Sequence, residues 1–268
     1  MKADRAGTAI GAFNVILLEH AEAIIAGAEA AGLPVILQVS QNAVKYHGAL
    51  APISLAALAC VGSSSIPASL HLDHAEDTEL IRQALDLGYD SIMYDGSKLN
   101  FKENIETSKA MSELARSYGA TIEVELGEIG GKDGVHAPGV RTKPSDAKSF
   151  VTETGVDLLA VAVGSSHAMT IRDAQLDFEL ISEIHALVPV PLVLHGSSGV
   201  SDLDLQRAVR SGMRKINIAT HLNHIFSNSI RSTLAADPGL VDPRKYIGVG
   251  RTEVSQEITR LLKILDLD

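Results

Sequence analysis

Three histidines stand at the ends of apolar segments that are rich in β-branched residues. His74 closes the segment LHLDH, His167 closes VAVGSSH, and His195 closes PLVLH. Neutral imidazoles are the usual ligands of catalytic zinc sites, which keep one coordination position open. One such histidine alone is more often a structural or surface residue. Three of them at the ends of three different segments predict a shared zinc site.

Carboxylates mark two other apolar segments. Asp95 follows SIMY, and Glu125 lies within TIEVEL, where Glu123 shares its face because side chains alternate with a period of two along a strand. A carboxylate that points into a protein interior needs a cation or hydrogen-bond donors to offset its lost hydration. Two interpretations are therefore open for Asp95 and Glu125: a second metal position or a structural salt bridge.

Two short segments have the composition of anion-binding turns. Gly196-Ser197-Ser198-Gly199 precedes a helix predicted from Asp202, and small residues there allow backbone N–H groups to face a ligand. The segment from Asn217 to Thr220 ends another apolar stretch and opens a further helix. The two turns predict a ligand that carries a phosphate group.

The elements that must position these residues alternate along the chain, an apolar segment and then a longer segment of helical period, eight times. The predicted strands are Ala9–Val15, Pro34–Val39, Ala68–Asp73, Ser91–Tyr94, Thr121–Leu126, Asp157–Val163, Pro191–Leu194 and Lys215–Ile218. The predicted helices lie near 19–31, 49–62, 77–87, 102–118, 145–154, 176–187, 202–211, 221–235 and 253–265. Nearly continuous apolar strands are typical of parallel sheets covered on both faces. Strict alternation leaves a closed barrel or an open doubly wound sheet.

The position of the unusual polar residues favours the barrel. They gather at the C-terminal ends of the eight predicted strands: Asn14, Ser40, Asp73 with His74, Asp95, Glu123 with Glu125, His167, His195, and Asn217 with Thr220. Active sites of (β/α)8 barrels are built on that face, and the loops after strands seven and eight commonly bind phosphate. We therefore predict an α/β protein, a single (β/α)8 TIM barrel domain over residues 1–268. The long segment from Gly127 to Pro144 is predicted to be a lid or binding loop.

Composition and charge exclude several classes of partner. The 268-residue chain has a formal net charge of −10 and no block rich in Lys and Arg, which argues against nucleic acid or a membrane as a partner. It contains no run of about 18 apolar residues and no hydrophobic signal region, so we expect a cytoplasmic protein. Cys60 is the only cysteine, which excludes an intrachain disulfide.

Nine segments, in order, resemble the class II, metal-dependent fructose- and tagatose-bisphosphate aldolases, and the likeness covers essentially the whole chain. The segments are Ile10-Gly-Ala-Phe-Asn-Val15, Val35-Ile-Leu-Gln-Val-Ser40, His71-Leu-Asp-His74, Met93-Tyr-Asp-Gly-Ser97, Glu123-Val-Glu-Leu-Gly127, Val163-Gly-Ser-Ser-His167, Leu194-His-Gly-Ser-Ser-Gly199, Lys215-Ile-Asn-Ile-Ala-Thr220 and Asp242-Pro-Arg-Lys-Tyr246. Members of this family are (β/α)8 barrels, which agrees with the fold predicted from the alternation of strands and helices.

The resemblance implies ligands for metals and substrate. Catalytic Zn²⁺ would be bound by His74, His167 and His195, and a second divalent metal by Asp95 and Glu125. The phosphorylated sugar, and in part a monovalent cation, would contact Asn14, Ser40, Ala168, Gly196, Ser197, Ser198, Asn217, Ile218, Ala219, Thr220 and Arg251.

The resemblance also implies the proton-transfer residues. Asp73 would be the acid/base residue at the cleaved bond. In the loop after the fifth strand the family usually places a Glu two residues after Gly-Gly to exchange the proton on the ketone half. Here Asp133 has that position, after Lys132, and is the candidate base. Two other departures are Ala168, where the family has Gly beside the phosphate and a monovalent cation, and His221, where it often has an acidic residue.

The implied activity is reversible cleavage of fructose 1,6-bisphosphate to dihydroxyacetone phosphate and glyceraldehyde 3-phosphate, with zinc as the Lewis acid. Arg244 and Arg251 would suit the second phosphate. The alternatives are an aldolase of another phosphorylated ketose or sugar acid, of the tagatose 1,6-bisphosphate or inositol-catabolism type, and a metal-binding barrel without catalysis. Asp73 beside His74 favours an enzyme. Family members are commonly dimers or tetramers, so we expect a homodimer or homotetramer.

Overall fold

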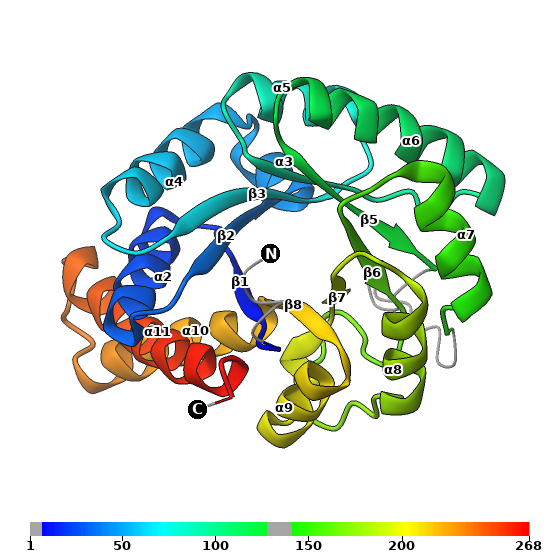
Figure 1. Ribbon diagram of the computed structural model, residues 1–268. Coiled ribbons are helices and arrows are strands. Elements are labelled where there is room, and N and C mark those ends of the chain that lie inside the picture. The colour runs from blue at the N-terminus through cyan, green and yellow to red at the C-terminus, as the bar shows by residue number, and fades with distance from the viewer. Residues whose placement is uncertain (1–6, 128–140, 268) are drawn as a thin grey trace.

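Eight parallel strands form a closed barrel, in which each strand pairs with the next and β8 pairs with β1 (Figure 1). The computed structural model describes residues 7–127 and 141–267. The strands are β1 (Ile10–Asn14), β2 (Val35–Ser40), β3 (Ala68–Ala75), β4 (Ser91–Tyr94), β5 (Thr121–Leu126), β6 (Leu158–Val161), β7 (Leu192–Leu194) and β8 (Met213–Ile218). The predicted (β/α)8 barrel is confirmed.

Helices surround the barrel on its outer side, as Figure 1 shows. They are α2 (Leu18–Ala31), α3 (Gln41–His47), α4 (Ala51–Ser63), α5 (Thr78–Asp86), α6 (Phe101–Ser117), α7 (Pro144–Thr154), α8 (Phe178–Leu187), the short 3-10 helix η1 (Ser197–Gly199), α9 (Asp202–Ser211), α10 (Thr220–Ala236) and α11 (Pro243–Leu265). Because every strand is parallel to its neighbours, the carboxyl ends of all eight meet at one mouth of the barrel.

The main hydrophobic core lies between the strands and the helices. Outward-facing strand residues such as Leu72, Ile122 and Ile216 belong to it and are completely buried. Removal of such side chains from water is the dominant force that closes the barrel. The neighbours of these residues along each strand point into the barrel, because side-chain direction alternates.

The inside of the barrel has an apolar part and a polar part. Leu158, Ala160 and Val193, on β6 and β7, form a small apolar cluster that is separate from the main core. Inward positions on several other strands hold buried polar residues instead, among them Gln38, His71, Glu123, Lys215 and Asn217. Charged groups in such a place must be paired, since they have lost their hydration.

The sequence pattern predicts no helix at 41–47, where the structure has α3. Ser40 caps this helix by accepting a hydrogen bond from the Ala43 N–H at 3.1 Å, and Gly48 ends it in the left-handed conformation, with φ of 77°. Both signals are local side-chain effects. Seven residues are too few to display a helical period, so the periodicity alone could not reveal this helix.

The last helix begins at Pro243 rather than near residue 253 as predicted. Asp242 accepts a hydrogen bond from the Arg244 N–H at 3.1 Å, and proline is well suited to the first turn of a helix. Gly250 interrupts the apolar pattern of this helix. A Cβ there would lie 2.9 Å from the Phe226 ring, so close packing of α11 on α10 accounts for the glycine.

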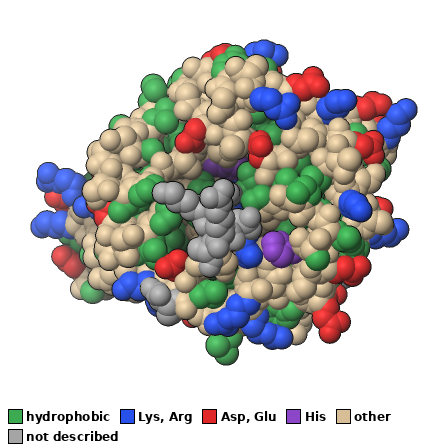
Figure 2. Space-filling model, viewed as in Figure 1, with side chains coloured by type: hydrophobic (Ala, Val, Ile, Leu, Met, Phe, Trp, Pro, Cys, Tyr) green, Lys and Arg blue, Asp and Glu red, His purple; other side chains and the backbone are tan. Residues whose placement is uncertain are grey.

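On the face seen in Figure 2, acidic and basic side chains are interspersed around the edge of the barrel. Among the helices of the described ranges, none is by itself long and apolar enough to cross a membrane. Only α3 and α4 taken together pass that test of length and composition, and a bend of 118° separates their axes.

Candidate metal centre

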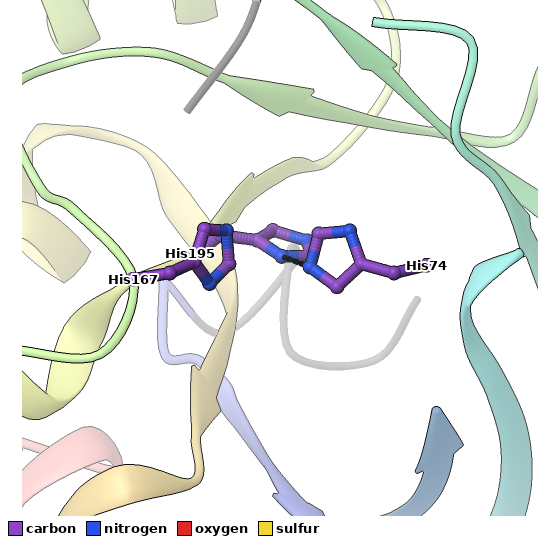
Figure 3. Close-up of side chains that lie close together, drawn as sticks. All are labelled: His74, His167 and His195. Carbon is purple, nitrogen blue, oxygen red and sulfur yellow. Dashed lines mark hydrogen bonds between the residues drawn. The ribbon is translucent and has the colours of Figure 1, made fainter. Parts of the chain in front are cut away.

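Three histidine rings meet at the mouth of the barrel (Figure 3). His74 comes from β3, His167 from the loop after β6, and His195 from the residue that follows β7. The ring centroids lie 4.6 Å apart for His74 and His195, 4.8 Å for His74 and His167, and 5.6 Å for His167 and His195. One nitrogen from each ring lies within 4.8 Å of the others, so the three rings can hold one metal ion.

Two of these rings are bound by buried carboxylates. Each carboxylate contacts the outer nitrogen of its ring, the one that faces away from the other histidines. His74 Nδ1 lies 2.8 Å from Asp95 Oδ2, and His195 Nε2 lies 2.8 Å from Glu123 Oε1. An ionised carboxylate only accepts hydrogen bonds, so each ring donates with its outer nitrogen. In the neutral rings, His74 Nε2 and His195 Nδ1 then carry lone pairs that face each other across 2.8 Å. Facing lone pairs repel, and a cation beside them removes that conflict.

The backbone at His74 departs from a regular strand. His74 has φ of 48°, in the left-handed region, and the pairing of β3 with β4 shifts register between Leu72 and Ala75. In a regular strand Asp73 and His74 would point to opposite faces. Here both line the same pocket. The local irregularity therefore brings two adjacent residues to one site. Beyond it Ala75 pairs with Tyr94, so β3 extends past the predicted end at Asp73.

Asp95 and Glu125 form a second possible cation site with His74. His74 Nδ1 lies 3.6 Å from Glu125 Oε2, and Asp95 Oδ1 accepts hydrogen bonds from the Ser97 N–H and hydroxyl at 3.2 and 2.6 Å. Both carboxylates are buried. A metal here would compete with His74 for Asp95, so the geometry is compatible with both alternatives that the sequence leaves open.

A chain of hydrogen bonds fixes the orientation of the amides next to Asp73. Asn14 Nδ2 donates to Asp73 Oδ2 at 2.9 Å, and Asn14 Oδ1 accepts from Gln38 Nε2 at 2.9 Å. The order of donors follows from Asp73, which can only accept. Within residues 7–127 and 141–267, Asp73 Oδ1, Gln38 Oε1 and Asn217 Oδ1 are buried in the pocket lining without a partner. Three such acceptors suit a ligand that is rich in hydroxyl groups.

The charge environment of Asp73 favours its ionised form. Burial raises the pKa of this carboxyl group, but the protonated forms of His74 and His195, the Lys215 ammonium group and the hydrogen bond from Asn14 outweigh burial and hold the pKa below its usual value. Asp73 is therefore a carboxylate near neutral pH. With Oδ2 bound to Asn14, its other oxygen can accept a proton from a ligand hydroxyl.

The two anion-binding turns lie against each other and line this pocket, a cavity of about 320 Å³. Ser198 Oγ accepts hydrogen bonds from the N–H groups of Ala219 and His221, at 3.4 and 3.1 Å. Gly196 has φ of 65°, and a Cβ there would lie 2.5 Å from the Ser166 carbonyl oxygen, so only glycine fits. The turn after β7 is thereby held next to the start of α10.

The remaining predicted contacts have different positions. Ser40, Ala168, Ser197 and Thr220 line the pocket together with Asn14, Gly196, Ser198, Asn217 and Ala219. Ile218 belongs to the hydrophobic core and is absent from the pocket lining. Arg251 does not reach the pocket, because its guanidinium binds Glu22 at 2.6 Å on the outer side of α2. Asp133 lies outside the described residues.

Some pocket residues were missed by sequence reasoning. Gln38 precedes Ser40 by two positions and so shares its face, a signal that the period of a strand offers. Lys45 lines the pocket from α3, and Lys98 lines it from the segment after β4, where its ammonium group lies 3.0 Å from Glu76. Lys45 was missed because α3 itself was not predicted.

The chain is similar to known proteins over nearly its whole length. The family described as fructose-bisphosphate aldolase class-II matches residues 1–267. The chain is 37% identical over 254 residues to the fructose-bisphosphate aldolase of Geobacillus stearothermophilus, covering 93% of this chain and 88% of that protein. It is 37% identical over 256 residues to the probable fructose-bisphosphate aldolase of Bacillus subtilis, covering 94% and 90%. The crystal structure of the YdjI aldolase from Escherichia coli K12 aligns with a TM-score of 0.86 at 30% identity, covering 98% and 93%.

Proposed function

The chain belongs to the class II fructose-bisphosphate aldolase family, and we propose that it cleaves fructose 1,6-bisphosphate reversibly to dihydroxyacetone phosphate and glyceraldehyde 3-phosphate. The observation that carries this proposal is the convergence of three imidazole rings at the barrel mouth, where His74 Nε2 and His195 Nδ1 lie 2.8 Å apart. Together His74, His167 and His195 form the donor set of a catalytic zinc site. The proposed enzyme is one barrel domain over residues 1–268.

Zinc, when bound, supplies a Lewis acid that stabilises the negative charge developing on the ketone half as the carbon–carbon bond breaks. The residues around it divide the remaining work. Asp73 takes the proton from the hydroxyl on the aldehyde half, and its buried Oδ1, which has no partner in the described structure, supports this role. Asn217 and Gln38 accept hydrogen bonds from other hydroxyls, and these contacts orient the sugar.

The phosphate of the ketone half is proposed to bind between the two turns. Gly196, Ser197, Ser198, Ala219 and Thr220 line the pocket there, and the start of α10 adds the favourable end of a helix dipole. Ala168 lies beside them. In this family a monovalent cation would share that position, and Asp133 would exchange the proton on the ketone half.

Asp95 and Glu125 are the proposed position of a second divalent metal. The enzyme is further proposed to be cytoplasmic and to act as a homodimer or homotetramer. Neither proposal changes the roles given to the three histidines, because all three belong to this chain and meet within one barrel.

The lining of the pocket also supports a second candidate substrate. Among the described residues no arginine lines the pocket, and its cationic side chains are Lys45 and Lys98 at the rim. A phosphorylated ketose or sugar acid whose far end differs from that of fructose 1,6-bisphosphate is therefore the second candidate substrate.

The test is a coupled assay of aldol cleavage with fructose 1,6-bisphosphate, tagatose 1,6-bisphosphate and the corresponding 1-phosphates. We expect chelator to abolish cleavage of fructose 1,6-bisphosphate and Zn²⁺ to restore it. A panel in which only another ketose is cleaved would move the assignment to the second candidate. No cleavage of any member by zinc-replete protein would leave a metal-binding barrel without catalysis.

A further inference from the structure

A fully buried group of charged and polar side chains lies inside the barrel, one layer below the three histidines. Lys215 Nζ donates to Glu123 Oε2 at 2.6 Å, and the other oxygen of Glu123 accepts from His195 Nε2 at 2.8 Å. Lys215 Nζ also lies 3.3 Å from His71 Nε2, and His71 Nδ1 lies 2.8 Å from Ser91 Oγ. Burial and the Lys215 ammonium group hold the pKa of His71 well below its usual value, so His71 is neutral and accepts from Lys215.

The barrel does not need charges in this position in order to be filled. On β6 and β7, Leu158, Ala160 and Val193 fill the adjoining part of the interior with apolar side chains. Leu158 is the register partner of Glu123, and Val193 is that of Lys215. A buried ion pair is often no more stabilising than apolar residues of the same volume, because both ions lose their hydration. The Lys215–Glu123 pair therefore calls for an explanation other than packing.

Lys215 is not placed to react with a substrate. It is absent from the lining of the pocket at the barrel mouth and contributes instead to a cavity at the other end of the barrel. Its ammonium group is taken up by Glu123 and His71. A nucleophilic lysine would need its amino group in the substrate pocket, so a lysine-imine mechanism does not fit Lys215.

Glu123 also connects the Lys215–Glu123 pair to His195, through a hydrogen bond in which His195 is the donor. Glu123 accepts from the outer nitrogen of the ring, which leaves the lone pair of Nδ1 aimed at His74 and the metal position. Outer carboxylates of this kind fix the tautomer and the rotation of a metal-binding imidazole. Lys215 in turn fixes Glu123, because it binds the oxygen that His195 does not use.

We infer that Lys215 and Glu123 are positioning residues that hold His195 in the tautomer and orientation required to bind metal. This inference rests on the proposed zinc site. Neither residue touches the substrate pocket, so removing them should act first on metal affinity and only through it on catalysis. A merely structural pair would affect unfolding and leave the affinity of the folded protein for zinc unchanged.

The first test is Glu123→Gln, which is nearly isosteric but can present an N–H to His195. We expect the dissociation constant for Zn²⁺, measured by competition with a chromogenic chelator, to rise about 10- to 100-fold. In the metal-free protein, ¹⁵N NMR of labelled histidine should show His195 protonated at Nε2 in the wild type and altered in the variant. A wild-type His195 protonated only at Nδ1 would overturn the inference. Both readouts are independent of substrate, so they stand apart from the test of aldolase activity.

The second test separates affinity from stability. Lys215→Met leaves Glu123 buried without its cation, whereas the double variant Lys215→Met/Glu123→Gln removes both charges and should regain stability. We expect the double variant to fold and still to bind Zn²⁺ about 10- to 100-fold more weakly than the wild type. Arg214→Met is the matched control, since Arg214 is a buried cation on the same strand that bonds to the carbonyls of Val209 and Met213. A folded double variant with wild-type zinc affinity would refute the positioning role.

Discussion

Two layers inside the barrel are built from consecutive inward positions of the same strands, and they differ in how well their polar atoms are satisfied. In the lower layer the Lys215 ammonium group, both oxygens of Glu123 and both nitrogens of His71 have partners. In the upper layer, two residues further along β3, Asp73 has a buried oxygen without a partner in the described structure. The difference indicates that the lower layer is complete without a ligand and that the upper layer is organised to receive one.

The left-handed backbone supports the same distinction. Of the three residues other than glycine with positive φ in the described structure, His74 and Ala168 line the pocket of the upper layer, and the third is Leu267 near the C-terminus. Such conformations cost on the order of 1 kcal/mol or more and gather at functional sites. The upper layer therefore combines strain with unsatisfied acceptors, whereas neither is found in the lower layer.

The largest effect should come from removing a zinc ligand of the upper layer. His167→Ala is expected to lose bound zinc and, with it, several kcal/mol of transition-state stabilisation, which is at least about 10³-fold in rate. Elemental analysis and the cleavage assay should fall together. His224→Ala, which removes an exposed histidine of α10, is the control and should change neither. Full zinc occupancy in His167→Ala would remove this residue from the site.

A smaller loss is expected at Asp73, the residue with the unpartnered oxygen. Asp73→Ala should lower kcat by about 10²–10⁴-fold, the usual contribution of a positioned acid/base group, while zinc content stays unchanged. Exchange of the dihydroxyacetone phosphate proton with solvent should fall much less, because the ketone half binds to the zinc and the two turns. Cleavage at nearly the wild-type rate by a zinc-replete variant would rule out this role.

A third network, at the outer edge of the barrel, is as well paired as the lower layer but less buried. Glu257 accepts from His221 at 2.7 Å and from Arg260 at 2.6 Å, and these contacts outweigh burial to lower its pKa to about 2. Because the pKa of Glu257 is lower in the folded state than its unfolded value of 4.5, ionised Glu257 stabilises the fold at pH values above 4.5. This stabilisation is lost as the pH falls towards 2. Glu257→Gln should therefore cost about 1 kcal/mol or less at pH 7, after solvent screening, and progressively less below pH 4.5. Urea unfolding at several pH values measures this difference, and a cost that does not depend on pH would contradict it.

The smallest effect concerns strain in the upper layer. Ala168 has φ of 57°, a region that glycine enters without steric cost. Ala168→Gly should relieve about 1–2 kcal/mol of backbone strain in the folded state. Part of this stabilisation is offset because glycine raises the conformational entropy of the unfolded chain. The expected net stabilisation is about 0.5–1 kcal/mol, measured by denaturant unfolding. Destabilisation by the glycine would show that the conformation at Ala168 is not strained.

The strands of this structure and the end of the barrel that carries the site could be predicted, because short stretches of sequence indicate them. The eight strands are apolar, β-branched segments, and the polar residues at their ends indicate which mouth carries the site. The pairing of Glu123 with Lys215 could not be predicted, since it depends on how β5 and β8 face each other across the closed barrel. The position of Arg251 depends likewise on how α11 packs against α2, which brings it to Glu22.

The claim that most depends on geometry is that one zinc ion lies among the three histidines. Diffraction data collected on either side of the zinc absorption edge from crystals of the active enzyme would locate the ion directly. We expect one strong anomalous peak about 2.0–2.1 Å from His74 Nε2, His195 Nδ1 and one nitrogen of His167. Fully active crystals whose zinc peak lies only between Asp95 and Glu125, or nowhere near the three histidines, would contradict the claim.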